Sequence, residues 1–369
     1  MSTHAYIRSI GTAVPENRIS QSIHHEILEH ANGMNREERF LLRQIYRHSG
    51  IEYRHSVLSE FGEKEKENNI LFHPSNHHPA VQVGERMNIF EQQAINLAEK
   101  AAMNCLENDD IKKSEITHLI TFSCTGMSAP GIDIQLVERL GLEKSVERTC
   151  INFMGCYAGI NALKTAHHII RSEPESVVLL AGVELCTIHY QKSFGSDQMV
   201  ANAIFSDGAA AVLLSAKKSN ATFNLKLQNF YSEFEPAGIN EMVWKIGNNG
   251  FDLKLSLYVP SMIEGSIGNL VSRLFEKFKI QQEDISYYAL HPGGVKILEA
   301  CEHALKISKD KNAISYDILK NYGNMSSVTI LFILKKYLDS FTEDARGKKI
   351  FSAAFGPGLT MECMIAEVN

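Results

Sequence analysis

Three residues of the sequence could build a nucleophilic site, and the first is Cys156. It lies between a strand-like and a helix-like segment, in the stretch Gly-Cys-Tyr-Ala-Gly. The positive end of a helix dipole lowers the pKa of a nearby thiol and favours the reactive thiolate. Cysteine is also among the most frequently buried residues, so an inert core thiol is the competing interpretation.

His291 and Asn324 could complete such a site. His291 opens His-Pro-Gly-Gly after a strand-like segment, a turn that leaves its imidazole projecting from the strand end. There it could pair with a thiolate or donate to a developing oxyanion. Asn324 precedes a helix-like segment, where its amide could polarise a carbonyl oxygen without titrating. A turn histidine and a plain helix cap are the competing interpretations.

Alternating strand and helix patterns must position these residues. Strand-like segments cover residues 116–122, 148–153 and 176–182, and helix-like segments cover residues 90–107, 132–140 and 158–171. Such alternation predicts an α/β sheet layered with helices.

The second half repeats this order, with strand-like segments at 285–290 and 349–354 and a helix-like segment at 326–338. Cys156 lies 40 residues after Ile116, and Asn324 lies 39 residues after Ile285. We therefore predict a duplicated α/β unit whose halves meet at a shared site near these helix N-termini. The predicted halves span residues 1–217 and 222–369.

Composition and charge bound the class of protein. With 369 residues the chain can bury a large core. A net charge of −6 argues against a nucleic-acid surface. No segment approaches the ~18 apolar residues of a membrane helix, and the N-terminus lacks the apolar region of a secretory signal. We therefore expect a cytoplasmic protein with no membrane span and no nucleic-acid partner.

Other motifs predict no metal and no bound cofactor. The seven cysteines include no Cys-x-x-Cys pair, which argues against a zinc ribbon or a disulfide framework. His73, His77 and His78 fall in a polar stretch that, with the charged segment 59–69, is predicted to be exposed loop or frayed helix. No dinucleotide-binding or P-loop motif occurs.

Six motifs resemble one family. They are IGTAVPEN from Ile10, GCYAG around Cys156, FSDGAAAVLL from Phe205, HPGGVKIL from His291, YGNMSSVTILFIL from Tyr322 and FGPGLTMEC from Phe355. The sequence resembles, over nearly its whole length, the type III polyketide synthases, the chalcone synthase group of the thiolase-like superfamily. The resemblance implies a duplicated thiolase-like α/β fold with αβαβα layers, and a homodimer.

The resemblance also implies the chemistry. Cys156 would accept a starter acyl group from an acyl-CoA or acyl-ACP thioester. His291 and Asn324 would hold the thioester oxygen of malonyl-CoA, promote its decarboxylation and stabilise the resulting enolate. The carbanion would attack the acyl-Cys156 thioester, and repeated rounds with a cyclisation would follow. CoA thioesters would be the substrates, with no further cofactor.

Pocket positions are carried over from the same resemblance. The substrate pocket would include Phe205, Cys124, Cys186, Leu253 and Phe355. Cysteines replace two plant threonines, Leu253 replaces a phenylalanine, and Ala129 replaces the methionine that crosses the plant dimer. These departures, with the stretches ELCTIHYQ and WKIGNNGFDLKLSLYVP, resemble the bacterial branch that makes alkylresorcinols and alkylpyrones from fatty acyl starters.

The CoA site is assigned by the same route. In the plant enzymes, basic residues of an N-terminal helix hold the CoA phosphates, and Arg43 and Arg47 are the counterparts here. Gly293, Gly294 and Ser326 are assigned to the same site. An ordinary solvated helix face is the competing interpretation of the arginines.

Three other functions stay open from the sequence alone. They are a single-round ketoacyl synthase of the III type that uses acyl carrier protein, a hydrolase with a Cys-His-Asn triad, and a non-catalytic relative that binds a ligand. Malonyl-CoA separates them, because only the condensing enzymes release CO2 from it.

Overall fold

A computed structural model describes residues 3–31, 34–62, 69–71, 81–191, 195–256 and 258–369. The main sheet contains β1 (Tyr6–Ala13), β4 (His118–Ser123), β5 (Glu147–Asn152), β6 (Val177–Leu185), β7 (Asp207–Ser215), β8 (Leu225–Phe234), β11 (Ile285–Leu290), β12 (Lys349–Gly356) and β13 (Thr360–Val368). Its strand order is β11-β12-β13-β8-β1-β7-β6-β4-β5. Two small sheets pair β2 (Asn17–Ser20) with β3 (Tyr53–Ser56) and β9 (Met242–Gly247) with β10 (Gly250–Leu255).

The main sheet repeats one strand arrangement twice. Along the first set, β1-β7 and β7-β6 are antiparallel and β6-β4 is parallel. Along the second set, β8-β13 and β13-β12 are antiparallel and β12-β11 is parallel. β1 joins β8 where Tyr6 faces Lys226 and Ile7 faces Leu225. The duplicated α/β fold expected from the sequence is confirmed.

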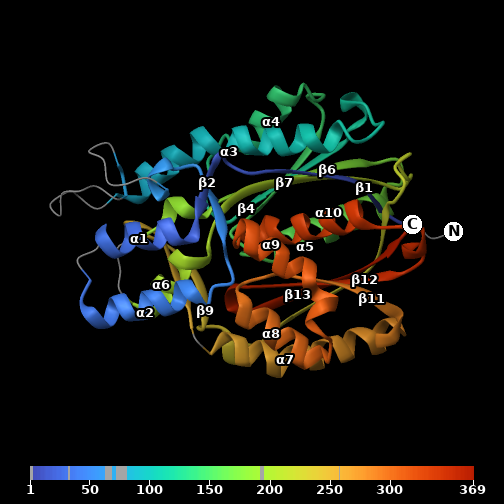
Figure 1. Cartoon of the computed structure of the whole chain (residues 1–369). Helices are drawn as coiled ribbons and strands as arrows, with labels where there is room; N and C mark the ends of the chain where they lie inside the picture. Colours follow the sequence, from blue (N-terminus) through green and yellow to red (C-terminus); the bar gives the residue numbers. More distant parts are fainter. Residues whose placement is uncertain (1–2, 32–33, 63–68, 72–80, 192–194, 257) are drawn as a thin grey trace.

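Helices complete five layers (Figure 1). The outer helices α3 (Val83–Leu106) and α4 (Ile132–Leu140) cover the first strand set, and α7 (Val259–Phe278) and α8 (Val295–Leu305) cover the second. Between the two sets lie α5 (Ala158–Ser172), α9 (Ala313–Tyr322) and α10 (Thr329–Ser340). α10 buries every residue from Thr329 to Leu334, as expected for a helix enclosed between sheets. The remaining helices, α1 (Gln21–Ala31), α2 (Arg36–Arg47) and α6 (Ser196–Ile204), lie together at one end of the sheet.

Several predicted elements agree with the structure, and others need correction. The segments 132–140 and 285–290 are α4 and β11 residue for residue. The helix expected over 90–107 begins earlier, at Val83. The helix expected from residue 326 opens with a separate 3-10 turn, Ser326–Val328, because Ser326 adopts φ +50°.

The charged segment 59–69 is only partly described. Glu60 and Phe61 are buried in a short 3-10 helix, Ser59–Phe61, so the prediction of an exposed loop is wrong there. Phe61 is buried because its ring stacks on His24, 4.9 Å between centroids. His73, His77 and His78 lie outside the described residues. Among the helices that are described, none is long and apolar enough to cross a bilayer.

Candidate active site

A tight turn presents Cys156 to the interior. The chain leaves β5 through Phe153 at φ +63° and Gly155 at φ +83°, and α5 begins two residues after Cys156. A β-carbon on Gly155 would lie 2.1 Å from Cδ of Pro357, so only glycine fits. The Gly-Cys motif of the first half therefore packs directly against the Phe-Gly-Pro-Gly motif of the second.

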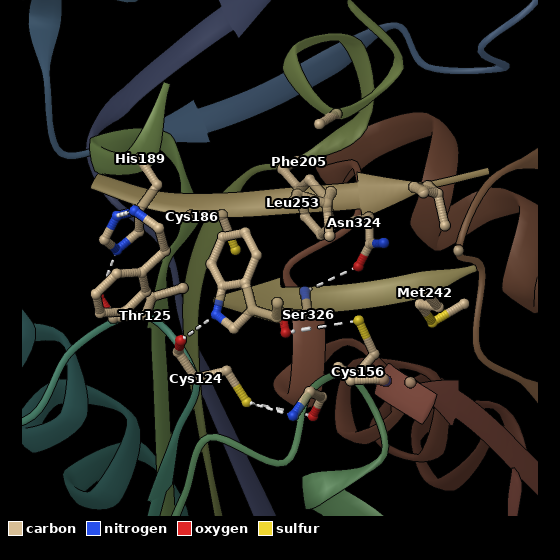
Figure 2. A pocket seen from close by; sticks show the side chains of 18 of the residues that line it. Cys124, Thr125, Cys156, Cys186, His189, Phe205, Met242, Leu253, Asn324 and Ser326 are labelled. Carbon is tan, nitrogen blue, oxygen red and sulfur yellow. Dashed lines mark hydrogen bonds between the residues drawn. The ribbon is translucent and has the colours of Figure 1, made fainter. Parts of the chain in front are cut away.

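Cys156, His291 and Asn324 line one pocket, although they come from different halves of the chain. Figure 2 shows Cys156 and Asn324 in this pocket. The Cys156 thiol lies 3.6 Å from the Ser326 hydroxyl oxygen. The Ser326 backbone N–H donates to Oδ1 of Asn324 at 2.8 Å. This bond fixes the amide plane and leaves the NH2 group of Asn324 as a donor to the pocket.

His291 is buried at the end of β11, and its backbone N–H donates to the Ala353 carbonyl at 2.9 Å. Neither ring nitrogen has a hydrogen-bond partner among the described residues. Burial lowers the pKa of His291 to about 3, so the ring is a neutral imidazole at neutral pH. One nitrogen can therefore donate to a substrate oxygen while the other accepts a proton.

The protonation state of Cys156 differs from the sequence expectation. Burial raises the pKa of its thiol to about 12, and hydrogen bonds from Ser326 and Asn324 offset this only in part. The prediction that the helix terminus lowers this pKa is therefore wrong, because desolvation outweighs the dipole. The thiol and the imidazole are both neutral at neutral pH.

The five predicted pocket residues all lie in the wall of one pocket. Phe205, Leu253, Phe355, Cys124 and Cys186 all line the pocket that holds Cys156. Cys124 does more than fill space, because its sulfur accepts from the Gly155 N–H at 2.8 Å and lies 3.3 Å from the Gly155 carbonyl oxygen. This thiol thus holds the peptide next to Cys156.

Two family models together cover nearly the whole chain. The N-terminal domain of chalcone and stilbene synthases matches residues 1–218, and the C-terminal domain of the same enzymes matches residues 226–368. The chain belongs to the chalcone and stilbene synthase family. Curated relatives are named type III polyketide synthases, and the chain is accordingly an acyltransferase of the iterative, decarboxylative condensing kind.

Curated relatives align with most of this type III polyketide synthase. "Probable polyketide synthase 1" of Dictyostelium discoideum is 29% identical over 99% of the chain, which spans 12% of that longer protein. "Alpha-pyrone synthesis polyketide synthase-like Pks18" of Mycobacterium tuberculosis is 29% identical over 99% of the chain and 92% of the relative. "Type III polyketide synthase A" of Arabidopsis thaliana is 31% identical over 77% of the chain and 73% of the relative.

Solved structures share the architecture. PKS-I from the brown alga Ectocarpus siliculosus superposes with a TM-score of 0.92 at 27% identity, covering 100% of this chain and 99% of that one. The C-terminal type III domain of Steely1, a type I/III hybrid from Dictyostelium, gives 0.90 at 29% identity and 99% coverage of each chain. The thiolase-like fold class is confirmed, and family membership sets aside the hydrolase and the non-catalytic relative.

The β9-β10 hairpin supplies pocket residues of this synthase that the sequence interpretation missed. Met242, Trp244 and Phe251 line the pocket. The indole N–H of Trp244 donates to the Cys124 carbonyl at 2.7 Å, and Phe251 stacks on His189 at 4.0 Å between centroids. The sequence Gly-Asn-Asn-Gly between two alternating segments is a hairpin signal that could have located them.

Glu184 is a second residue that was missed, because one acidic residue in an apolar strand forms no recognisable motif. Its buried carboxylate accepts from the Cys124 N–H at 3.0 Å and from the Thr125 hydroxyl at 2.8 Å, and it also accepts from the Ser327 hydroxyl. Burial raises the pKa of Glu184 above its usual range. These bonds join Cys124 of the first half to Ser327 of the second half through Glu184.

The predicted CoA site is divided in the structure. Arg43 and Arg47 are exposed on α2 and do not line the pocket, and Arg43 pairs with Glu29 at 3.1 Å. Gly293 lines the pocket, whereas Gly294 is the residue before α8. Ser326 lies beside the Cys156 thiol, a position that suits the reacting thioester better than CoA phosphates.

Proposed function

We propose that this type III polyketide synthase loads a fatty acyl starter on Cys156, extends it with malonyl-CoA and cyclises it to an alkylpyrone or alkylresorcinol. One observation carries the proposal: Cys156, His291 and Asn324 line a single pocket whose remaining wall is largely apolar. The roles of these residues are part of the proposal. The starter can arrive as an acyl-CoA or as an acyl-ACP thioester.

The residues divide the chemistry between them. The Cys156 thiol attacks the starter thioester and passes its proton by way of His291 to the departing thiolate. Malonyl-CoA then loses CO2, and the enolate oxygen accepts hydrogen bonds from His291 and the Asn324 amide. The enolate carbon attacks the acyl thioester, the C–S bond to Cys156 breaks, and a β-ketoacyl-CoA longer by two carbons is released.

The pocket wall supports an aliphatic starter. Cys186, Leu253, Met242 and Phe355 present sulfur and hydrocarbon to the space beside Cys156. Both ring nitrogens of His189, a polar group of this wall, already bond main-chain groups, Thr125 O and Phe251 N. An alkyl chain beside this ring would therefore leave neither nitrogen newly unpaired. Each buried CH2 contributes roughly 0.8 kcal/mol, so longer chains should bind better until the pocket is full.

The product class rests on similarity. Pks18 of Mycobacterium tuberculosis, named for alpha-pyrone synthesis, aligns with 99% of this chain at 29% identity. We extend an α-pyrone, or the related resorcinol, to this chain by that similarity together with the apolar pocket.

A cytoplasmic homodimer completes the proposal. β5 forms one edge of the main sheet, and all of its residues except Ile151 are exposed. Such an edge invites pairing with a second strand. Met127 and Ile134 add exposed apolar side chains nearby in the sequence. Light scattering on the purified protein should give twice the mass of the chain; a monomer would exclude this part.

The function is tested by supplying malonyl-CoA with acyl-CoA starters of increasing length, with p-coumaroyl-CoA as a competitor. Mass spectrometry should show pyrones or resorcinols from medium and long acyl chains. Cys186→Phe should shift the preference to shorter chains by filling the wall, whereas Cys186→Ala, the matched control, should keep long starters. A preference for p-coumaroyl-CoA, or a length profile that Cys186→Phe leaves unchanged, would contradict the proposal.

A further inference from the structure

Arg54 is a buried cation in the wall of the active-site pocket. It lies on β3 and is 3% exposed. One terminal nitrogen donates to the carbonyls of Asn202 at 2.7 Å and of Phe205 at 2.9 Å, which are the last turn and the C-cap of α6. The other terminal nitrogen contacts Nδ1 of His24. A guanidinium at this place gives the Phe205 carbonyl a donor and shares the Asn202 carbonyl with the Tyr46 hydroxyl, 3.3 Å away.

No carboxylate contacts this guanidinium among the described residues. Burial lowers the pKa of Arg54, and Tyr46 and then Asp207 counter this only in part. The Asp207 oxygens accept from Val57 N at 2.9 Å and from the Thr187 hydroxyl at 2.6 Å. Nε of Arg54 has no hydrogen-bond partner in the described part of the chain. A buried arginine without an ion pair is costly, so a purely stabilising role explains it poorly.

The segment that Arg54 holds is bonded to the backbone of Asn324. The Asn324 N–H donates to the Ile204 carbonyl at 2.9 Å, and the Ser206 N–H donates to the Asn324 carbonyl at 2.9 Å. Phe205 and Asn324 thus form an isolated parallel bridge between the two halves. Residues 204–206 fix the main chain of Asn324 from both sides.

The aliphatic stem of Arg54 packs beside Gly323, the residue before Asn324. Gly323 has φ +70°, and a β-carbon on it would lie 3.0 Å from Cγ of Arg54 and 3.0 Å from the Ile204 carbonyl. Hence the residue before Asn324 packs on the aliphatic part of Arg54 while the guanidinium bonds the opposite strand of the bridge. One side chain thus bonds Phe205 of the bridge and packs beside Gly323, the residue before Asn324.

We propose that Arg54 is a positioning residue for the decarboxylation step, holding the Asn324 amide and the Phe205 ring in the places where malonyl-CoA is cleaved. The proposal rests on the role proposed for Asn324. Cys156 lies on a different turn, in which Gly155 packs against Pro357 and not against Arg54. Loss of Arg54 should therefore slow the decarboxylation of malonyl-CoA while leaving starter loading on Cys156 largely unchanged.

The test measures starter loading and decarboxylation separately in Arg54→Met and Arg54→Lys. Intact-protein mass spectrometry follows starter loading on Cys156, and CO2 release from malonyl-CoA follows decarboxylation. Hydrogen bonds to a buried charge are worth roughly 10-fold to 100-fold, so Arg54→Met should lower the kcat of decarboxylation by about that factor while KM and loading change less than about threefold. Arg54→Lys keeps a donor cation and should recover part of the loss. If Arg54→Met fails to fold, Gly323→Ala, whose β-carbon would crowd Cγ of Arg54, should likewise lower decarboxylation more than starter loading.

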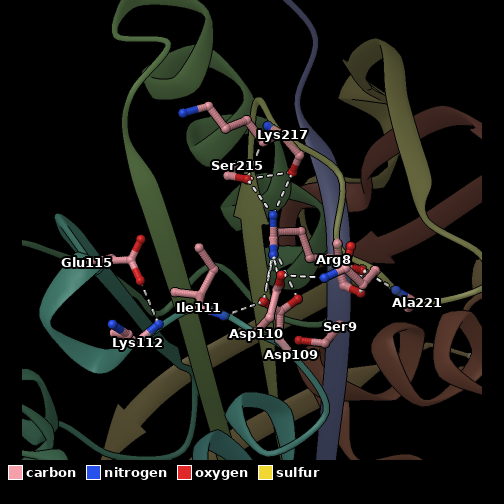
Figure 3. Close-up of polar contacts among 12 residues, drawn as sticks. Arg8, Ser9, Asp109, Asp110, Ile111, Lys112, Glu115, Ser215, Lys217 and Ala221 are labelled. Carbon is pink, nitrogen blue, oxygen red and sulfur yellow. Dashed lines mark hydrogen bonds and ion pairs between the residues drawn. The ribbon is translucent and has the colours of Figure 1, made fainter.

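Arg8→Met is the matched control, because Arg8 is also buried but does not line the pocket. It bonds the Lys217 carbonyl at the connection between the two halves (Figure 3). It should lower the melting temperature without separating loading from decarboxylation. Equal losses of loading and decarboxylation in folded Arg54→Met, no loss at all, or normal kinetics in both Arg54→Lys and Gly323→Ala would each overturn the proposal. A wild-type enzyme that releases no CO2 would instead refute the function proposed for the pocket.

Discussion

The cluster around Arg8 and the pocket around Cys156 both bury polar groups, but they leave those groups in opposite states. Arg8 donates to the Asp109 carboxylate at 2.8 and 3.1 Å and to the Lys217 carbonyl at 2.9 Å, and it also bonds Asp110 (Figure 3). In the pocket, neither nitrogen of His291 has a partner among the described residues.

The contrast separates stability from chemistry. A buried polar group without a partner costs free energy of folding, and such groups persist where a ligand supplies the missing bond. Arg8 connects β1 with the loop after α3 and with the link between the halves, so its hydrogen bonds stabilise the fold. His291 keeps both ring nitrogens available for the substrate oxygen and the proton transfer that we propose.

Removing the nucleophile should have the largest effect. Cys156→Ala should abolish polyketide formation, because no acyl-enzyme can form. Slow CO2 release from malonyl-CoA should persist, since His291 and Asn324 remain. Liquid chromatography with mass spectrometry would detect both, and product formation at the wild-type rate would show that the thiol is not the nucleophile.

Arg8→Met should test the stabilising role of the Arg8 cluster. It strands the buried Asp109 carboxylate without its cation and should cost about 3–5 kcal/mol of unfolding free energy. Urea denaturation measures the loss, and turnover per folded molecule should stay near that of the wild type.

Arg43→Met, which removes an exposed arginine paired with Glu29, should cost less than about 1 kcal/mol. A loss as small as this for Arg8→Met would mean that the Arg8 cluster does not hold the halves together.

Asn324→Ala should lower decarboxylation by roughly 100-fold to 1000-fold, the usual effect of losing one oxyanion donor. Starter loading on Cys156 should stay largely intact, because the enolate develops only in the second step. Intact-protein mass spectrometry reports loading and CO2 release reports the second step. Lost loading with normal decarboxylation would reverse the assignment.

A smaller effect should appear in the acid stability. Burial depresses the pKa of His291 to about 3, below the ~6.5 of an unfolded histidine, so the unfolded chain binds the proton more readily. The stability that comes from keeping this ring neutral is complete above about pH 6.5 and is lost as the pH falls toward 3.

At pH 5 this single group should cost about 2 kcal/mol relative to pH 7. His291→Asn removes the group, so its stability should fall less than that of the wild type over this interval, as measured by urea denaturation at both values. Parallel losses in the two proteins would show that the ring is already charged or exposed.

Periodicity and turn chemistry in the sequence determined the repeated strand and helix order and placed Cys156, His291 and Asn324 at element ends. α4 and β11 match their predicted bounds because each is a local pattern of apolar residues with clear stop signals. The division of the chain at residues 217–222 and the catalytic roles stay predictions. The family motifs pointed to the five pocket residues that the structure brings together.

Tertiary structure alone decided what surrounds those residues. Three residues reach the site or the segments that support it from distant parts of the sequence: Trp244, Glu184 and Arg54. No local sequence pattern predicts such long-range contacts. The pKa of Cys156 was mispredicted for the same reason. The helix terminus is visible in the sequence, whereas the desolvation that outweighs it comes from packing two halves of the chain around one thiol.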